Sequence, residues 1–432
     1  MRRALVGLVV VGGLAGFGLL THQLRQPAPT GAALGLAELP QGLVFAEPLD
    51  PPAGVIEGRF AALGPEGWEI VDAPDADAVF RQLPDAIEVE PLLRVRASGA
   101  PNDPRYPYQW NLQGLDMPAA WDSSQGEGAV IAVLDTGVSE KLDGFAPLLE
   151  GYDITRDRPG APDDGWHGTH VAGVVAQATN NGEGVAGIAP RATILPVKVL
   201  DAKGGGNSVH LAEGIRWAVD NGADIINLSL GLDQPSSPVE QACDYARDNG
   251  VLVVAATGND GLRQVQYPAA YEGVIAVAAV DLNYEVTDYS NVGPSVDLVA
   301  PGGDLGADLD GDGLVDGIMQ AAKLNGEWQY VLAEGTSVAT PHVSGTAALL
   351  FANGVTDPER IRDQLLGTAE DLGDAGHDPM TGWGLLDPVS ALSTTTASVD
   401  EGDRYDGSWS TTPTTNEGTQ PLDSAPRGCS TR

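Results

Sequence analysis

Cysteine and basic side chains are scarce in this chain of 432 residues. The two cysteines, Cys243 and Cys429, cannot build a disulfide framework, and neither cysteine nor glutamate stands at zinc-ligand spacing beside His170 or His342. Lysine and arginine together number 23 against 60 acidic residues, so the formal net charge is −37. The phosphates of a nucleic acid would repel such a chain, which excludes nucleic acid as a partner.

An apolar run long enough to interact with a membrane occurs at the start of the chain. Residues 4–20 follow Arg2 and Arg3 and are slightly shorter than the ~20 residues that span a bilayer. We expect residues 1–30 to be an export signal peptide, either cleaved or retained as a membrane anchor. At the other end, residues 395–432 are rich in Ser, Thr, Asp and Gly. We expect a disordered acidic tail there, because these residues cannot bury enough apolar surface to fold.

Three short motifs stand in the order aspartate, histidine, serine. They are residues 133–137 (VLDTG), 167–173 (HGTHVAG) and 335–342 (GTSVATPH). A serine hydroxyl is a poor nucleophile at neutral pH, so it needs an imidazole to take its proton and a buried carboxylate to orient that imidazole. Asp135, His167 and Ser337 supply one of each. Each alone has a bland explanation, such as a turn aspartate, but their co-occurrence predicts a hydrolase with a serine nucleophile.

The flanking residues place each of these side chains at the end of a regular element. Residues 131–134 are an apolar run, which predicts a buried parallel strand with Asp135 at its carboxyl end, where open α/β sheets place their sites. His167 opens a predicted helix rich in Gly, Ala and Val. Ser337 precedes a predicted helix over residues 338–353, so its backbone amide lies at the positive end of that helix.

The wider pattern of strands and helices predicts the fold class. Strands are expected at residues 130–134, 194–199, 224–228 and 251–255, and helical segments alternate with them. Such alternation is typical of an α/β fold with a mainly parallel sheet flanked by helices on both faces.

In the order and content of these motifs, the chain resembles the subtilisin-like serine proteases (subtilases) over about residues 102–392. The resemblance implies that Asp135 orients His167, which acts first as general base and then as general acid. It implies that Ser337 forms an acyl-enzyme with the substrate. It also implies that Asn259 is the side-chain donor to the oxyanion.

The same resemblance identifies two edges that hold an extended polypeptide substrate. They are Ser229, Leu230 and Gly231 on one side, and Gly204, Gly205 and Gly206 on the other. Main-chain hydrogen bonds along such edges do not depend on the sequence of the peptide. The alternative is that these glycines are simple turn residues. Gln266 falls near the base of the specificity pocket, where we see no carboxylate, so we expect a broad or apolar preference.

Residues 31–101 occupy the position of the propeptide in this family, a small α/β unit that assists folding and blocks the cleft as an intramolecular inhibitor. This acidic segment contains two apolar stretches, residues 55–63 and 86–95, and residues 87–91 resemble its last strand. The catalytic domain is then expected to cover residues 102–394 and to act as a monomer. The alternative for the segment is a plain linker domain.

Two loops are predicted to bind calcium as a structural ion. In the first, carboxylates alternate along the loop as in an EF-hand, although position twelve is Met319; they belong to Asp308, Asp310, Asp312 and Asp316. The second is implied by the resemblance and comprises Thr179, Asn181, Glu183 and Val185, completed by Asp103 and Asp143. The alternatives are a solvated acidic loop and an ordinary Gly/Asn turn.

The sequence therefore predicts an exported serine endopeptidase that hydrolyses peptide bonds. Two alternatives stay open at this point. One is a processing protease dedicated to a single partner protein. The other is an inactive calcium-binding surface module with the fold of a protease.

Overall fold

The computed structural model describes residues 43–45, 55–64, 67–73, 76–84, 88–93, 100–145, 147–324 and 326–393. The predicted export signal, with its apolar residues 4–20, and the predicted acidic tail with Cys429 lie outside the described residues. No helix within the described ranges is long and apolar enough to cross a membrane.

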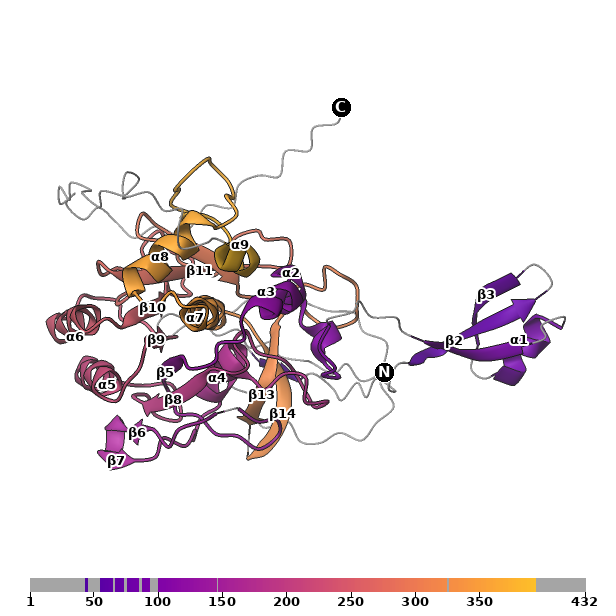
Figure 1. The fold of residues 1–432 in the computed structure, drawn as a ribbon, viewed down its shortest axis with the longest axis horizontal. Coiled ribbons are helices and arrows are strands. Elements are labelled where there is room, and N and C mark those ends of the chain that lie inside the picture. Colours follow the sequence, from indigo (N-terminus) through magenta and orange to yellow (C-terminus); the bar gives the residue numbers. More distant parts are fainter. Residues whose placement is uncertain are drawn as a thin grey trace, which may run out of the picture.

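A mainly parallel sheet of eight strands forms the centre of the molecule (Figure 1). In spatial order the strands are β12 (Leu298–Pro301), β11 (Val274–Val280), β10 (Leu252–Ala256), β9 (Ile225–Leu228), β5 (Val130–Asp135), β8 (Thr193–Lys198), β6 (Tyr152–Asp153) and β7 (Arg158–Pro159). Neighbouring strands run parallel except for β6 and β7. Four of these strands lie within one residue of the predicted ranges.

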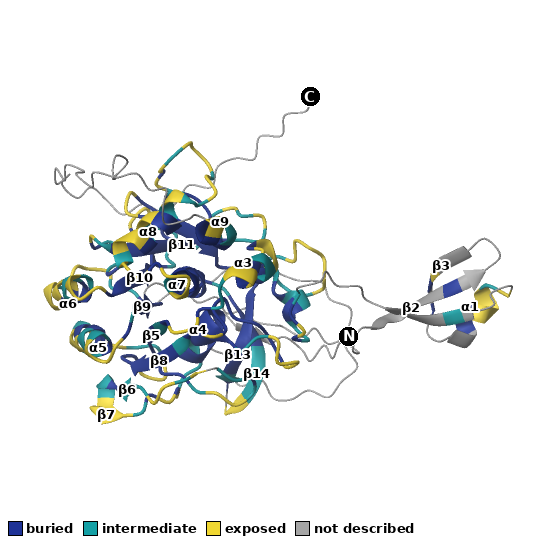
Figure 2. Ribbon diagram, in the orientation of Figure 1, coloured by how far each residue is buried: buried dark blue, intermediate teal, exposed yellow. Residues whose placement is uncertain are grey.

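Helices cover both faces of this sheet. On one face lie α4 (His167–Ala176) and α7 (Thr336–Ala352), and on the other α5 (Ser208–Asp220) and α6 (Ser237–Asp248) (Figure 1). The alternation of side chains along β5 explains this: Ile131 and Val133 pack with α4 and α7, whereas Ala132 and Leu134 pack with α5 and α6. Figure 2 shows the resulting buried layer along the sheet. The predicted fold class is confirmed.

Short helices complete the two layers. Helices α2 (Trp110–Gly114), α3 (Met117–Ser123), α8 (Pro358–Gly367) and α9 (Pro388–Ser393) contribute buried side chains to the core on the α4 and α7 side. Cys243 is buried in α6.

An antiparallel hairpin interrupts the alternation of strands and helices. It consists of β13 (Ile318–Leu324) and β14 (Glu327–Ala333), and β1 (Leu43–Phe45) pairs antiparallel with the outer edge of β14. The hairpin packs on α4 and leads directly into α7. It is absent from the strands expected above.

A separate small unit precedes the main sheet in the sequence. It contains β2 (Val55–Gly64), β3 (Gly67–Asp72), α1 (Ala76–Gln82) and β4 (Glu88–Leu93), with the strands in the antiparallel order β3-β2-β4. Helix α1 packs on this sheet through Ala78 and Val79. Both apolar stretches expected in this segment form strands.

The order of the strands determines where a site can lie. From β5 the chain crosses to β8 on one side, and then passes through α5 to β9 on the other side. The loops after β5 and β9 therefore diverge at the carboxyl edge of the sheet, which is where open α/β sheets bind their ligands.

Candidate active site

Asp135 and His167 form a hydrogen-bonded pair at the carboxyl end of β5. Asp135 is fully buried, and His167 Nδ1 lies 2.8 Å from its Oδ2 and 2.9 Å from its Oδ1. Because a carboxylate only accepts, Nδ1 carries the proton and Nε2 is the basic nitrogen. Burial lowers the pKa of His167, but the charge and hydrogen bond of Asp135, together with the charge of Asp163, outweigh burial, so the pKa is raised overall. The imidazole side chain remains 20% exposed.

Glycine allows the helix that carries His167 to approach the strand that carries Asp135. A methyl group on Gly168 would overlap the carbonyl oxygen of Gly137 and would lie 3.0 Å from the Cβ of Asp135. The backbone N–H of Gly168 donates to Thr136 Oγ1 at 3.0 Å. The glycine after His167 is therefore required for the distance between carboxylate and imidazole.

A second buried carboxylate, Asp163, lies behind this pair, and sequence reasoning missed it. It accepts hydrogen bonds from Thr136 Oγ1 at 2.8 Å, from Thr169 Oγ1 at 2.6 Å and from the backbone N–H of Gly165 at 2.8 Å. Burial raises its pKa, while these donors favour the charged form. Its charge also helps to raise the pKa of His167.

Ser337 and Asn259 meet beside Gly335. Helix α7 begins at Thr336, so Ser337 lies in its first turn rather than before it, which corrects the predicted boundary. Gly335 has φ 141°, and a methyl group there would lie 3.2 Å from both Asn259 Nδ2 and Ser337 Oγ. Asn259 Oδ1 accepts from the N–H and the hydroxyl of Thr336, each at 2.8 Å. The Nδ2 group of Asn259 is therefore the end of the amide that faces the serine.

The segment after β9 is joined to the turn that carries Ser337. Ser229 Oγ donates to the carbonyl oxygen of Ser337 at 2.6 Å and accepts from Asn227 Nδ2 at 2.9 Å. Leu230 is buried, and Gly231 contacts Gln266. This predicted substrate edge thus lies against the serine.

The opposite predicted edge is a turn between β8 and α5. The carbonyl oxygen of Gly205 accepts from the N–H of Asp201 at 2.8 Å, the N–H of Gly204 donates to the carbonyl of Asp201 at 3.0 Å, and Gly206 packs against Leu200.

Lys198, at the end of β8, is a fully buried basic residue close to Asp135 in the sheet. Its Nζ donates to the carbonyl oxygens of Thr136 and Leu200 at 2.7 and 2.6 Å, and so ties the ends of β5 and β8 together.

His170 and His342 are buried structural residues. Burial lowers the pKa of His170 to about 3 and that of His342 to about 4, so both are neutral at pH 7. His170 Nε2 lies 3.0 Å from the carbonyl of Ile318, and His342 Nδ1 lies 2.9 Å from the carbonyl of Val338. His170 thus joins α4 to β13, whereas His342 bonds within its own helix.

The acidic loop brings three of its four predicted carboxylates together. Oxygen atoms of Asp308, Asp310 and Asp316 lie within 4.8 Å of one another, whereas Asp312 is outside this group and accepts instead from the N–H of Leu314. Burial raises the pKa of Asp316 to about 6, and the neighbouring carboxylates add to this. A cluster of hard oxygen atoms whose charges repel one another suits a calcium ion.

The second loop gathers Asp103, Asp143, Asn181 and Val185. Both carboxylates are buried; Asp103 accepts from the N–H of Asn181, and Asp143 from Asn181 Nδ2 at 2.9 Å and the N–H of Val185 at 3.1 Å. Burial, with the charge of Asp103, raises the pKa of Asp143 to about 6. Thr179 and Glu183 lie in the same loop but, within the described residues, neither hydrogen-bonds to these carboxylates. Two buried carboxylates beside an amide suit a hard cation.

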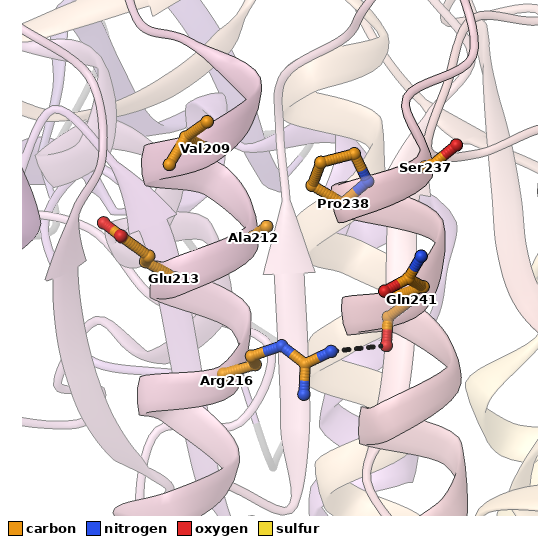
Figure 3. A pocket seen from close by; sticks show the side chains of 7 residues that line it. All are labelled: Val209, Ala212, Glu213, Arg216, Ser237, Pro238 and Gln241. Atoms are coloured by element: carbon orange, nitrogen blue, oxygen red, sulfur yellow. Dashed lines mark hydrogen bonds between the residues drawn. The ribbon is translucent and has the colours of Figure 1, made fainter.

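A surface cavity of about 340 Å³ lies away from this site, between α5 and α6 (Figure 3). Val209, Ala212 and Pro238 line it, and Arg216 spans the two helices by donating to the carbonyl of Gln241 at 3.1 Å. It lies on the helix layer opposite α4 and α7, and so is separate from the serine.

An α/β sheet that carries a carboxylate–imidazole pair, a serine in the first turn of a helix and an amide donor beside it has the features of a serine hydrolase. The subtilase family model matches residues 126–384. A thermophilic serine proteinase from Bacillus sp. (strain AK1) is 39% identical over 317 residues, which are 72% of this chain and 74% of that protein. Thermitase from Thermoactinomyces vulgaris is 40% identical over 279 residues, 64% of this chain and 94% of that protein.

A solved protease structure from Pseudoalteromonas arctica PAMC 21717 superposes with a TM-score of 0.62 at 36% sequence identity, over 68% of this chain and 98% of that one. The chain belongs to the subtilase family, and it is a subtilisin-like serine protease.

Proposed function

We propose that this protein is an exported serine endopeptidase whose catalytic residues are Asp135, His167 and Ser337. The observation that carries the proposal is the 2.8 Å bond between His167 Nδ1 and Asp135, with Ser337 Oγ and Asn259 Nδ2 together beside Gly335. The two pairs together supply a nucleophile, a base, an orienting carboxylate and an oxyanion donor.

In the proposed reaction, Ser337 Oγ attacks the carbonyl carbon of the peptide bond while His167 Nε2 takes the hydroxyl proton. Asp135 stabilises the imidazolium through Nδ1. Asn259 Nδ2 and the backbone N–H of Ser337 donate to the oxyanion. His167 then gives its proton to the leaving amine, and the acyl-enzyme is hydrolysed by a water molecule that the same imidazole activates.

The rest of the chain supports this activity in the proposed arrangement. Residues 1–30 direct export, residues 31–101 are a propeptide that inhibits the cleft in the same molecule, and residues 102–394 are a monomeric catalytic domain. The substrate is an extended polypeptide held between residues 204–206 and 229–231. Calcium at the two acidic loops stabilises the fold, and takes no part in the chemistry.

The experiment is to compare the parent with Ser337→Ala on casein and with a fluorophosphonate probe. We expect the parent to hydrolyse casein and to be labelled on Ser337, and the variant to lose both while still unfolding cooperatively on heating, because only one hydroxyl is removed. Hydrolysis of casein by the variant at the rate of the parent would contradict the assignment. A parent that reacts with the probe but cleaves only a single partner protein would identify a dedicated processing protease instead.

A further inference from the structure

Gln266 fills a gap that opens beside the serine. The backbone N–H of Gln266 donates to the carbonyl oxygen of Thr257 at 2.9 Å, which fixes the backbone of Gln266 next to the end of β10. A methyl group on Gly231 would overlap Gln266 Oε1, and one on Gly258 would lie 2.7 Å from its Cδ. The carboxamide therefore lies between Gly231 and Gly258. Gly231 is two residues after Ser229, which contacts Ser337, and Gly258 directly precedes Asn259.

Two carboxylates hold this carboxamide in one orientation. Gln266 Nε2 lies 3.0 Å from Asp233 Oδ1 and 2.9 Å from Asp260 Oδ2. Carboxylates only accept hydrogen bonds, so the NH₂ group faces them and Oε1 faces the two glycines. In the described part of the chain no hydrogen bond reaches Oε1, and neither carboxylate forms an ion pair with lysine or arginine.

The gap therefore presents negative charge without a matching cation. Burial raises the pKa of Asp260, and the charge of Asp233 adds to this. The sequence predicted that no carboxylate lies near Gln266. That prediction is wrong, because Asp260, directly after Asn259, and Asp233, two residues after the 229–231 edge, both contact Gln266. Both side chains turn back toward Gln266.

We propose that this gap binds the side chain of the substrate residue that supplies the cleaved carbonyl, the acyl-side residue, and that it prefers lysine or arginine. The inference rests on the proposed function and deepens it. Because the Gln266 carboxamide occupies the space between the two glycines, little room is left for a ring, whereas the terminal cation of a long, narrow stem can donate to Gln266 Oε1 beside Asp233 and Asp260. An apolar side chain of equal length leaves Oε1 without a donor.

The experiment measures kcat/KM on three fluorogenic peptides that differ only in the acyl-side residue: lysine, norleucine or alanine. Lysine and norleucine have similar stems, so their ratio reports the charge alone. We expect the ratio to be about tenfold in favour of lysine at low salt, and to fall as salt rises, because the carboxylates are partly exposed. The variant Asp233→Asn with Asp260→Asn is expected to bring the ratio to within about twofold of one.

Asp248→Asn with Asp363→Asn is the matched control, because both are exposed carboxylates, in α6 and α8, and the pair changes the net charge by two, as the test variant does. It is expected to keep the lysine preference. Equal or faster cleavage of the norleucine or alanine peptide by the parent would overturn this inference and leave the proposed function standing. If the parent cleaves none of the three peptides and does not cleave casein, the proposed function itself is overturned.

Discussion

Asn259 presents its side-chain NH₂ group to Ser337 because its Oδ1 already accepts two hydrogen bonds from Thr336. We expect Asn259→Ala to lower kcat and to change KM little, since the donor acts on the oxyanion of the transition state. In subtilisin, a member of the same family, loss of such a donor lowers kcat about 100- to 1000-fold, and we expect that range here. Steady-state kinetics on one peptide substrate measures both constants. A rise in KM with unchanged kcat would place Asn259 in ground-state binding instead.

Asp163 offers a test of pH dependence. His167 must be neutral to act as a base, so activity rises as pH rises through its pKa. Removing the charge of Asp163 lowers that pKa, since Asp163 is one of the charges that raise it. Asp163→Asn is therefore expected to shift the acidic limb of kcat/KM to lower pH. The control is Asp248→Asn, which should leave the limb where it is; a limb unmoved in both variants would mean that Asp163 only supports the loop.

The motif residues could be predicted from the sequence because their chemistry requires particular residue types in a fixed order. Asp163, Lys198 and Asp233 could not be, because the sequence does not state which polar side chains turn inward. Lys198 was visible only as the end of an apolar strand, yet it is buried and hydrogen-bonded to two carbonyl groups. For Asp163, the one available signal was its position four residues before His167.

At the scale of elements, strands β5, β8, β9 and β10 were predictable because they are continuous apolar runs. The hairpin β13 and β14 was not, because β14 mixes polar and apolar residues: Glu327 is exposed, whereas Val331 and Leu332 are buried. The pairing of β1 with β14 joins residues far apart in the chain, which no local pattern reveals.

We predict that maturation cuts the chain at the boundary between the small unit and the catalytic domain. If the protease cuts its own propeptide, the parent should lose the chain up to a point within residues 97–102, while Ser337→Ala should retain it. Strand β4 ends at Leu93, so this boundary follows the last strand of the small unit directly. Intact-mass measurement of both purified proteins decides the matter. Identical masses would mean that another protease makes the cut or that no cut occurs.

At the scale of the whole molecule, we expect the two acidic loops to make stability depend on calcium and pH together. The pKa values of Asp143 and Asp316 are raised to about 6, above their usual value, so without calcium the fold loses their contribution to stability as pH rises through about 6. A bound cation removes that loss. At a hundred times its dissociation constant it adds about 2.7 kcal/mol, or roughly 5 °C in melting temperature.

We therefore expect chelator to lower the melting temperature at pH 7.5 and to have a smaller effect at pH 5. Asp310→Ala should weaken the response to calcium without abolishing it, because the loop around Asp103 and Asp143 remains. Asp312→Ala is the matched control, since its carboxylate lies outside the cluster. Melting curves that do not change with chelator at pH 7.5 would show that both loops are solvated acidic turns.

The place of Ser337 has a consequence for timing during synthesis. The proposed nucleophile lies about two hundred residues after Asp135, and we expect it to reach the site only when α7 packs against β9, β10, β11 and β12. At about 5–20 residues per second, a ribosome makes Asp135 some 10–40 s before Ser337. We therefore expect a growing chain to be unable to hydrolyse its neighbours until almost the whole sheet has formed, and hydrolysis to begin only as folding is completed.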